Sequence, residues 1–329
     1  MFRTPVKLAV RNLWKYKAYS AINLAGLAMG LACFVLIAVW VQDELSYDRF
    51  HRNADRIVRV AQLDVENPGQ GICRVGAPWG PALQARFPEV EHYVRFRSAG
   101  RPLVAIGNQR FYENGGLYAD SAFFQVFTYT ILRGDRNAPL DDPAGIVLTA
   151  SLATKYFGDD DPVGQTLTLD GEDDRVVTAV MQDVPKQSHM HFDFLLPFSS
   201  YDNWDSNEWD VNNFYVYLLL QPGVDRAVFE EKVHRFAVDR TGAERMEGTL
   251  IALQPLVDIH LHSNLQRELE ANSDSTNVML FSIVALFILA IACTNFVNLT
   301  TARSATRAKE IGIRKVVGSQ RGGLIGQFL

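Results

Sequence analysis

The sequence predicts an integral membrane protein in which two transmembrane α-helices flank a large α+β extracytoplasmic domain of two subdomains. Residues 20–41 and 278–297 are long apolar runs without a charged side chain. A helix of about 20 apolar residues matches the thickness of the hydrocarbon core of a bilayer. The stretch between the runs is polar, and short patterns typical of helices and strands alternate along it, which favours the α+β class.

The composition is that of a folded protein with an acidic balance. Hydrophobic residues make up 48% of the 329 residues, which is enough for packed cores and excludes wholesale disorder. The formal net charge of -5 argues against a nucleic-acid partner, because such proteins usually present a basic surface. There are three cysteines, and only Cys73 lies between the apolar runs, so a disulfide framework is excluded.

Charge sets the predicted orientation in the membrane. Residues 1–19 carry five basic and no acidic side chains, and residues 298–329 carry six basic and one acidic side chain. The stretch 42–277 carries 21 basic and 36 acidic side chains. Because basic flanks stay in the cytoplasm, both ends are predicted to be cytoplasmic and the acidic middle extracytoplasmic.

The amino-terminal part is predicted to contain two helices. A cytoplasmic amphipathic helix is expected over 1–19, with an ordinary charged flank as the alternative. Its apolar face is formed by Phe2, Val6, Val10, Leu13 and Trp14. The first transmembrane helix is expected over 20–41. A cleaved signal peptide is disfavoured, because the apolar run continues past Cys33 to Val41.

The extracytoplasmic domain is predicted over 42–276. Residues 43–56 are expected to extend the first helix out of the membrane. Further helices are expected at 81–87, at 121–127 after an Asp120 cap, at 151–157 with Ser151 as the cap, and at 225–240. Strands are expected at 57–66, 91–97, 102–106, 110–118, 146–149, 165–169, 175–183, 191–197 and 213–220.

The second transmembrane helix is predicted over 277–300. In the first span, Gly26 and Gly30 form a G-x-x-x-G pattern that Ala21 and Ala25 extend, and such small residues let membrane helices approach closely. In the second span, Asn295 and Asn298 place amides near the inner leaflet. Hydrogen bonds between helices are the first interpretation of these amides, and a transport pathway is the second.

The sequence predicts no catalytic residues, no cofactor and no metal. It contains neither a G-x-x-x-x-G-K-[ST] phosphate loop nor a G-x-S-x-G elbow, and Cys73 has no base beside it. On strands, His189 would share a face with His191, and so would the second pair, His260 and His262. Structural or surface histidines are favoured over a metal site, since no third ligand is indicated, and the role of both pairs stays open.

Residues 302–329 read ARSATRAKEIGIRKVVGSQRGGLIGQFL. The segment starts as a basic helix, turns at Gly318 and becomes apolar again, as if it were cut at the start of a further membrane helix.

The chain resembles the amino-terminal portion of an ABC transporter permease of the MacB-like, FtsX-like family. The resemblance rests on four stretches: RNLWKYKAYSAINLAGLAMGL (11–31), YADSAFFQVFTYTILRGD (118–135), LTASLATKYFGDDDPVGQTLTLDG (148–171) and the carboxy-terminal 302–329.

The resemblance implies a non-catalytic transmembrane subunit in the bacterial inner membrane, with several spans. The middle, 42–276, would be a MacB-like periplasmic core domain. The partners implied are a cytosolic ABC ATPase, a second permease as homodimer or heterodimer, the lipid bilayer and a periplasmic adaptor. The function implied is export, lipoprotein release or mechanotransmission, with the substrate unspecified. Residues 301–329 would be the cytoplasmic coupling segment. Its ATPase-contacting residues would be Lys309, Glu310, Ile311, Gly312, Ile313, Arg314, Lys315 and Gly318.

Two other classes of protein compete with this interpretation. A two-span membrane sensor with an external ligand-binding domain would need sustained heptads after the second span, and glycines interrupt that segment. A membrane-tethered hydrolase would need a catalytic constellation. The coupling segment itself has a simpler alternative, a basic anchor for anionic lipid.

Overall fold

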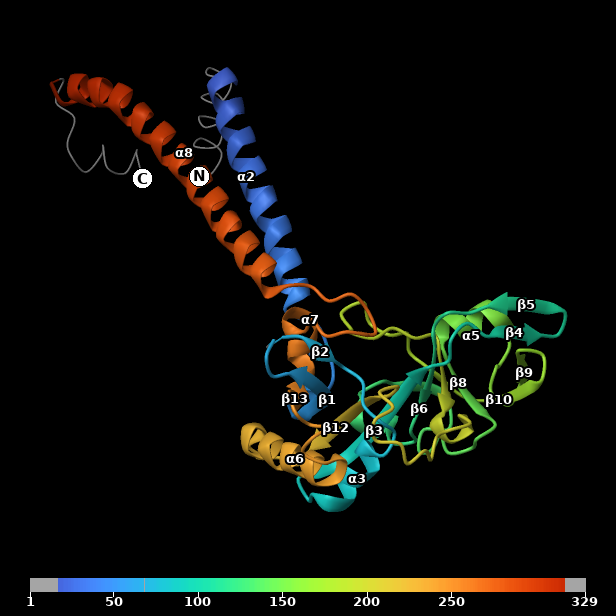
Figure 1. The fold of residues 1–329 in the computed structure, drawn as a ribbon. Coiled ribbons are helices and arrows are strands. Elements are labelled where there is room, and N and C mark those ends of the chain that lie inside the picture. Colours follow the sequence, from blue (N-terminus) through green and yellow to red (C-terminus); the bar gives the residue numbers. More distant parts are fainter. Residues whose placement is uncertain (1–16, 68, 317–329) are drawn as a thin grey trace. The chain divides into compact units, whose positions relative to one another are not determined.

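The computed structural model describes residues 17–67 and 69–316. They form two compact units, an outer domain of Glu44–Ser275 and a helix pair that continues on either side of it in the sequence (Figure 1). Most of the predicted amphipathic helix over 1–19 lies outside the described residues.

The helix pair consists of α2 (Lys17–Glu44) and α8 (Ser275–Val316). Ala21–Glu44 and Ser275–Asn298 are long and apolar enough to cross a membrane, judged by length and composition. The backbone of α8 continues without a break from Asn298 to Val316, through much of the basic segment.

A seam of half-buried and buried residues joins the two helices. In α2 these residues recur every three or four positions, at Leu27, Gly30, Phe34, Ile37 and Val41. In α8 the matching series is Val278, Ser282, Ala285, Leu289 and Ala292. This is the spacing of left-handed helix pairs. The ring of Trp40 also meets the ring of Phe281 edge-on, with centroids 5.1 Å apart.

The outer domain is built on one continuous hydrogen-bonded sheet, in the order β13-β1-β12-β3-β6-β11-β8-β10-β9-β4-β5, with β2 on β1 and β7 on β10. Its strands are β1 (Ile57–Asp64), β2 (Gly71–Ile72), β3 (Val90–Ser98), β4 (Leu103–Ile106), β5 (Gln109–Tyr112), β6 (Gly116–Ala119), β7 (Ile131–Gly134), β8 (Gly145–Thr149), β9 (Thr166–Leu169), β10 (Asp173–Met181), β11 (Phe194–Pro197), β12 (Tyr215–Leu220) and β13 (Thr249–Pro255). The pairs β8–β10 and β6–β11 are parallel and the other pairs are antiparallel, so the sheet is mixed.

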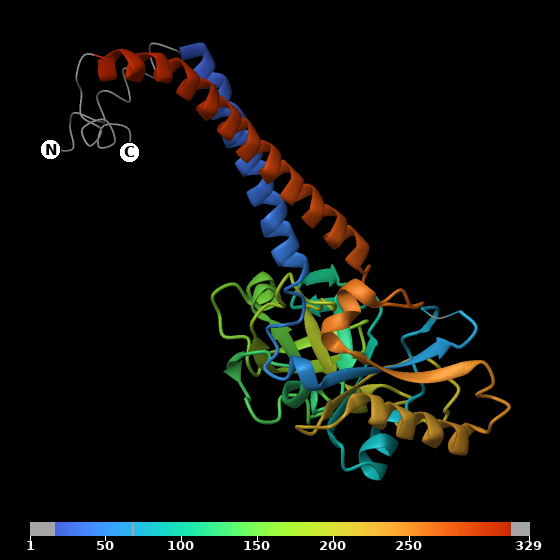
Figure 2. The same cartoon turned by 90° about the vertical axis from the view of Figure 1, so that its left-hand side faces the viewer.

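Short helices cover this sheet. They are α3 (Trp79–Arg86), α4 (Phe123–Val126), α5 (Ala150–Phe157), α6 (Arg226–Thr241), α7 (Ile259–His262) and the 3-10 turns η1 (Ala54–Arg56), η2 (Phe198–Ser200) and η3 (Leu256–Asp258). Figure 2 shows α6 lying along β1 and β13. Helix α6 begins after Asp225, whose carboxylate accepts hydrogen bonds from the backbone N–H groups of Ala227 and Val228.

Three hydrophobic clusters form the core of the outer domain. The central cluster includes Phe96, Phe123, Phe127, Tyr215 and Tyr217. The helix-side cluster, under α3 and α6, includes Trp79, Leu83, Leu218, Phe229 and Val233. The β10 cluster, under α5, includes Leu148, Leu152, Val177, Phe194 and Leu196. Since the central cluster takes residues from β1 and β12 as well as from β8 and β10, the strands from β1 to β10 share one core, whereas β13 packs in the helix-side cluster and β4 and β9 pack in the β10 cluster.

Strand β1 shows how alternation serves two clusters at once. Ile57 and Ala61 face the central cluster, whereas Val58 and Val60 face the helix-side cluster. Strand β1 therefore has both faces buried, which is why its sequence reads as a nearly continuous apolar run.

Three sequence-based expectations about this domain are wrong. Residues 43–56 do not extend the first helix, because α2 ends at Glu44 and turns follow, with Asp48 at φ 58°. The single strand expected over 110–118 is two strands, β5 and β6. The cap of α5 is Thr149 rather than Ser151, and its hydroxyl accepts the N–H of Leu152. Strands β7 and β13 and helix α7 were not expected.

Candidate functional site

The predicted coupling residues lie on the carboxy-terminal part of α8. The structure gives residues 309–315 a helical backbone continuous with the second apolar span. It does not describe their side chains, and Gly318 lies outside the described residues. Their contact with an ATPase therefore stays a prediction.

The predicted packing residues divide between two faces of the helix pair. A Cβ atom built on Gly30 would lie 2.7 Å from the Cβ of Ala292, and one on Gly26 would lie 3.3 Å from the Asn295 amide nitrogen. Real Cβ atoms do not approach as closely as 2.7 Å, so α8 leaves room only for glycine at position 30. In contrast, Ala21, Ala25 and Asn298 are exposed in the described structure and do not lie in this seam.

The two histidines of each predicted pair do not share a face of a strand. His189 and His191 precede β11, and His260 and His262 lie on the helix α7, so the period-two rule for strands does not apply. Among the described residues, no group of three or more His, Cys, Asp or Glu side chains could hold a metal ion. Three of these histidines instead contact carboxylates at the two places where the chain enters and leaves the outer domain.

We call residues 44–51 the first junction, because they follow α2, and residues 263–274 the second junction, because they precede α8. At the first junction, Glu44 lies 2.9 Å from the Nε2 atom of His260. The ring of Tyr47 stacks on the same imidazole, with centroids 3.3 Å apart and planes 3° apart. The end of α2 is thereby joined to α7, which lies just before the second junction.

A buried hydrogen-bonded chain also fixes the first junction. Asp48 lies 2.9 Å from the Nδ1 of His189, and the Nε2 of His189 lies 2.8 Å from the Tyr217 hydroxyl. Burial raises the pKa of Asp48, but the charge and hydrogen bonds of His189 outweigh that cause and the pKa is lowered. The carboxylate can therefore only accept, so Nδ1 carries the proton that it donates to Asp48.

The hydroxyl of Tyr217 ends this hydrogen-bonded chain. Burial raises the pKa of its phenol well above the ordinary value, so the hydroxyl keeps its proton. Its oxygen lies within hydrogen-bond distance of the Nε2 of His189. Nearby, burial lowers the pKa of His51 to about 4, and its Nδ1 accepts the backbone N–H of Thr128 at 3.0 Å. Side chains from distant parts of the sequence thus hold the first junction.

An ion pair inside the domain fixes the second junction. The guanidinium of Arg59, on β1, donates to both carboxylate oxygens of Glu268 at 2.5 and 2.8 Å. The Arg59 side chain is 0% exposed and that of Glu268 is 13% exposed. The same guanidinium also donates to Gln254 and Ser263. Such a bidentate pair holds both position and angle.

The backbone of the second junction is held as well. The thiol of Cys73 donates to the Arg267 carbonyl at 3.0 Å, and the hydroxyl of Tyr215 donates to the same oxygen at 2.8 Å. Arg267 has φ 61°. Burial raises the pKa of Cys73 to about 12, so this cysteine is a buried neutral donor and not a reactive thiol.

A more exposed pair, His191 and Glu270, ties the second junction to the segment before β11. The Nδ1 of His191 lies 2.7 Å from the Glu270 carboxylate, and its Nε2 lies 3.1 Å from the Pro185 carbonyl. Both ring nitrogens face acceptors, which favours the doubly protonated imidazolium. The hydrogen bond with Glu270 accordingly raises the pKa of His191 from 6.5. Burial raises the pKa of Glu270, but the hydrogen bond and charge of His191 lower it overall from 4.5.

This pair should make stability depend on pH. The raised pKa of His191 contributes stability below about pH 6.5, and this stability is lost as the pH rises through the pKa of the folded state. The lowered pKa of Glu270 contributes stability above about pH 4.5, and this stability is lost as the pH falls through the pKa of the folded state. Both side chains are 40% exposed, so we expect less than about 1 kcal/mol. In thermal melts, the destabilisation caused by His191→Gln should shrink between about pH 6 and pH 8. A destabilisation that stays constant over that range would contradict the assignment.

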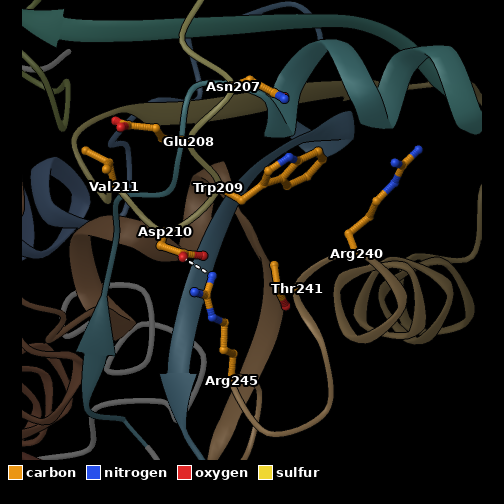
Figure 3. Close-up of a pocket in the computed structure, with 8 residues that line it drawn as sticks. All are labelled: Asn207, Glu208, Trp209, Asp210, Val211, Arg240, Thr241 and Arg245. Atoms are coloured by element: carbon orange, nitrogen blue, oxygen red, sulfur yellow. Dashed lines mark hydrogen bonds and ion pairs between the residues drawn. The ribbon is translucent and has the colours of Figure 1, made fainter.

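The outer domain also has a polar pocket of about 310 Å³ beside the end of α6 (Figure 3). Arg245 forms an ion pair with Asp210 on one side of it, and the guanidinium of Arg240 lies 6.0 Å from the centre of the Trp209 ring. The lining residues are Asn207, Glu208, Trp209, Asp210, Val211, Arg240, Thr241 and Arg245. Charges of both signs line the pocket, so it favours no one class of ligand.

Comparison with known proteins agrees with this architecture. The family model described as the MacB-like periplasmic core domain matches residues 20–236. The macrolide export ATP-binding/permease protein MacB of Neisseria gonorrhoeae is 23% identical over 244 residues, which cover 70% of this chain and 35% of that protein. The protein of the same name from Sodalis glossinidius is 22% identical over 346 residues, which cover 99% of this chain and 49% of that protein.

The chain therefore spans about a third to a half of the length of these curated relatives. The solved structure of a domain of a permease protein from Porphyromonas gingivalis has 23% identity and a TM-score of 0.54, and the match covers 70% of this chain and 99% of that one. This likeness shows a shared fold.

Two apolar helices and a mixed α/β domain of this fold define a membrane-embedded transporter component of the permease class. The family model matches well over half of the chain, so the chain belongs to the family of the MacB-like periplasmic core domain and to the MacB-like ABC transporter permeases.

Proposed function

We propose that this chain is part of the transmembrane permease subunit of an ABC transporter, and that it couples ATP hydrolysis by a separate cytosolic ATPase to motion of the outer domain. The observation that carries the proposal is the match of the family model to residues 20–236. The relatives' names combine an ATP-binding and a permease function. The 329 residues contain no phosphate loop, so we assign hydrolysis to a partner and no catalysis to this chain.

The charge distribution supports the proposed orientation. With basic flanks and an acidic middle, both ends of the chain would lie in the cytoplasm, and residues 42–276 would lie on the outer side of the inner membrane. The working assembly would contain two permeases and an adaptor on the outer side. Its task would be export of a substrate such as the macrolides named for the relatives, lipoprotein release or mechanotransmission.

The continuous helix α8 supports the proposed coupling. The helical backbone is unbroken between residues 309–315 and the membrane span, so a displacement of that segment would reach the span without passing through a loop. In that segment, apolar Ile311 and Ile313 lie among charged side chains, as expected of a docking element. A lipid anchor would need only the positive charges.

Substitutions that leave the basic residues intact separate docking from anchoring. Gly312→Leu adds bulk to a packed contact and should weaken copurification of the ATPase about ten-fold, a loss of about 1.4 kcal/mol. Glu310→Ala should have a smaller effect in the same direction, because it removes one ion-pair partner. Substrate-dependent ATPase activity should fall in the same order. Both variants are to be made in the full-length permease at equal expression.

A charge-removing variant is the matched control. Arg303→Ala lowers the positive charge outside the proposed contact, so an anchor should respond to it and a docking element should not. Wild-type copurification and activity in Gly312→Leu and Glu310→Ala, together with a loss in Arg303→Ala, would replace the coupling assignment by the anchor.

A further inference from the structure

The two junctions of the outer domain are tied to neighbouring strands of the same sheet. The first junction reaches β12, through Asp48, His189 and the hydroxyl of Tyr217. The second junction reaches β1, through the ion pair of Glu268 with Arg59. Strands β1 and β12 are antiparallel neighbours, so both connections end in one part of the core.

The two connections meet side by side. Arg59 and Tyr217 are direct partners in the register of β1 and β12. Side chains of directly opposed residues have Cβ atoms about 4.5–5.5 Å apart. Both side chains also lie on the face of the central cluster, since Arg59 alternates with Ile57 and Ala61 of that cluster and Tyr217 belongs to it. The two polar connections, one from each junction, therefore lie side by side at the centre of the sheet, and we call them together the polar chain.

This polar chain is buried almost throughout. Asp48, Arg59 and Tyr217 are 0% exposed, and His189 is 4% exposed. An Asp-His-Tyr series resembles a catalytic triad, but here it is sealed from solvent, so no substrate can reach it. Buried ion pairs do not by themselves make a protein more stable than apolar residues of similar size would. What they supply is a defined geometry. A hydrogen bond is lost when its donor and acceptor move apart, whereas apolar side chains can shift and stay in contact.

The junctions have a particular need for such geometry. Residues 45–53 and 263–274 are turns and coil, without a strand or an α-helix of their own. Segments of this kind bend under load unless side-chain contacts hold them. The buried chain supplies those contacts, at one or two points in each junction.

We propose that these buried side chains act as a lock that holds the two junctions at a set distance. Asp48, His189 and Tyr217 tie the first junction to β12, and Glu268 and Arg59 tie the second junction to β1. A displacement of the polypeptide at either junction is then delivered to the sheet instead of being absorbed by the turns. The five residues are positioning residues. The displacement itself rests on the proposed function, whereas the lock does not.

Two conservative variants open the lock. Tyr217→Phe removes only the hydroxyl that hydrogen-bonds with His189. Glu268→Gln removes only the charge that pairs with Arg59. Asp120→Asn is the matched control, because Asp120 forms a bidentate pair with Arg95 in the same sheet, away from both junctions. The exposures of that pair, 6% and 15%, resemble the 0% and 13% of Arg59 and Glu268.

The lock is tested by the distance between the junctions. Spin labels are attached at Leu45→Cys in the first junction and at Ala271→Cys in the second, and both positions are exposed. The distance between the labels reports the distance between the junctions. Cys33 and Cys293 are replaced by serine, and buried Cys73 is retained. The distance distribution is measured by pulsed electron paramagnetic resonance on the full chain in lipid nanodiscs. We expect a narrow distribution in the parent and in Asp120→Asn, and a clearly broader one in Tyr217→Phe and in Glu268→Gln.

Thermal melts separate this role from general stability. Glu268→Gln and Asp120→Asn should lower the melting temperature by similar amounts, on the order of 10 °C, because each breaks a comparable buried pair. Distributions as narrow as the parent's in both lock variants, or equal broadening in Asp120→Asn, would overturn the proposal.

The measurement is then repeated with the full-length permease and its ATPase. If the lock variants broaden the distribution but the ATPase neither copurifies with the full-length permease nor changes its activity in response to it, the lock stands and the proposed function fails. If ATP shifts the distance equally in the parent and in both lock variants, the proposed function stands and the lock fails.

Discussion

Phe123→Ala is expected to lower the free energy of unfolding of the outer domain by about 3–5 kcal/mol, the usual cost of removing a fully buried phenylalanine. Phe123 is 0% exposed and lies on the single-turn helix α4. Its ring stacks on Tyr129 at 5.7 Å and meets Phe192 edge-on at 5.6 Å. The central cluster contains residues from β1, β3, β6, β8, β10, β11 and β12, so the cavity would weaken the middle of the sheet as a whole.

Denaturant unfolding of the full chain in detergent, followed by near-ultraviolet circular dichroism, measures this effect. Phe124→Ala is the matched control, because the neighbouring ring is only partly buried against the same cluster. We expect the control to lose clearly less stability. Equal losses in the two variants would show that Phe123 does not have the central position that its contacts indicate.

Gly30→Leu is expected to separate α2 from α8 at the centre of the helix pair. A Cβ at position 30 already falls 2.7 Å from the Cβ of Ala292, and leucine adds three more carbon atoms. Overpacking of this kind costs about 1–3 kcal/mol, and a helix pair relieves it by moving apart. Gly26→Leu should have a smaller effect, because the atom it meets is the side-chain amide of Asn295.

Cross-linking within one chain reports this separation. Trp40→Cys and Phe281→Cys, in a chain with Cys33 and Cys293 replaced by serine, place two thiols where rings now touch. A short bis-maleimide should join them efficiently in the parent and poorly in Gly30→Leu. Ala28→Leu, at an exposed position of the same helix, should leave the yield unchanged. An undiminished yield in Gly30→Leu would mean that the close approach at Gly30 does not hold the pair together.

Local patterns predicted most of the secondary structure of the outer domain. The expected strand 213–220 is β12, and the expected strand 146–149 is β8, because each is a short apolar run bounded by polar residues. The expected helix 225–240 is α6, with Asp225 as its cap. Strand β13 was missed. Its residues 250–253 form a short apolar run of the same kind, and their pairing with β1 places them in the sheet.

The error over residues 43–56 has a different cause. The composition of this segment suits a helix, and it follows a long helix directly. Tertiary contacts end the helix, because the carboxylate of Asp48 is drawn inward to His189 and the ring of Tyr47 lies on His260. Arg59 did leave a signal in the sequence: a lone charged residue between Val58 and Val60 in an apolar strand must find a buried partner. Nothing in the sequence indicated that Glu268 would be that partner.

By itself, the sequence predicted the two long apolar helices, the α+β class of the middle and the resemblance to MacB-like permeases, because hydrophobic runs, periodicity and motifs are properties of neighbouring residues. The tertiary structure alone decided how closely each glycine of the G-x-x-x-G pattern approaches α8, and which carboxylates His189, His191 and His260 contact. Asp48 and His189 are 141 positions apart, and Arg59 and Glu268 are 209 positions apart. Contacts over such separations are made by the packing of the sheet, and no local pattern in one sequence specifies them.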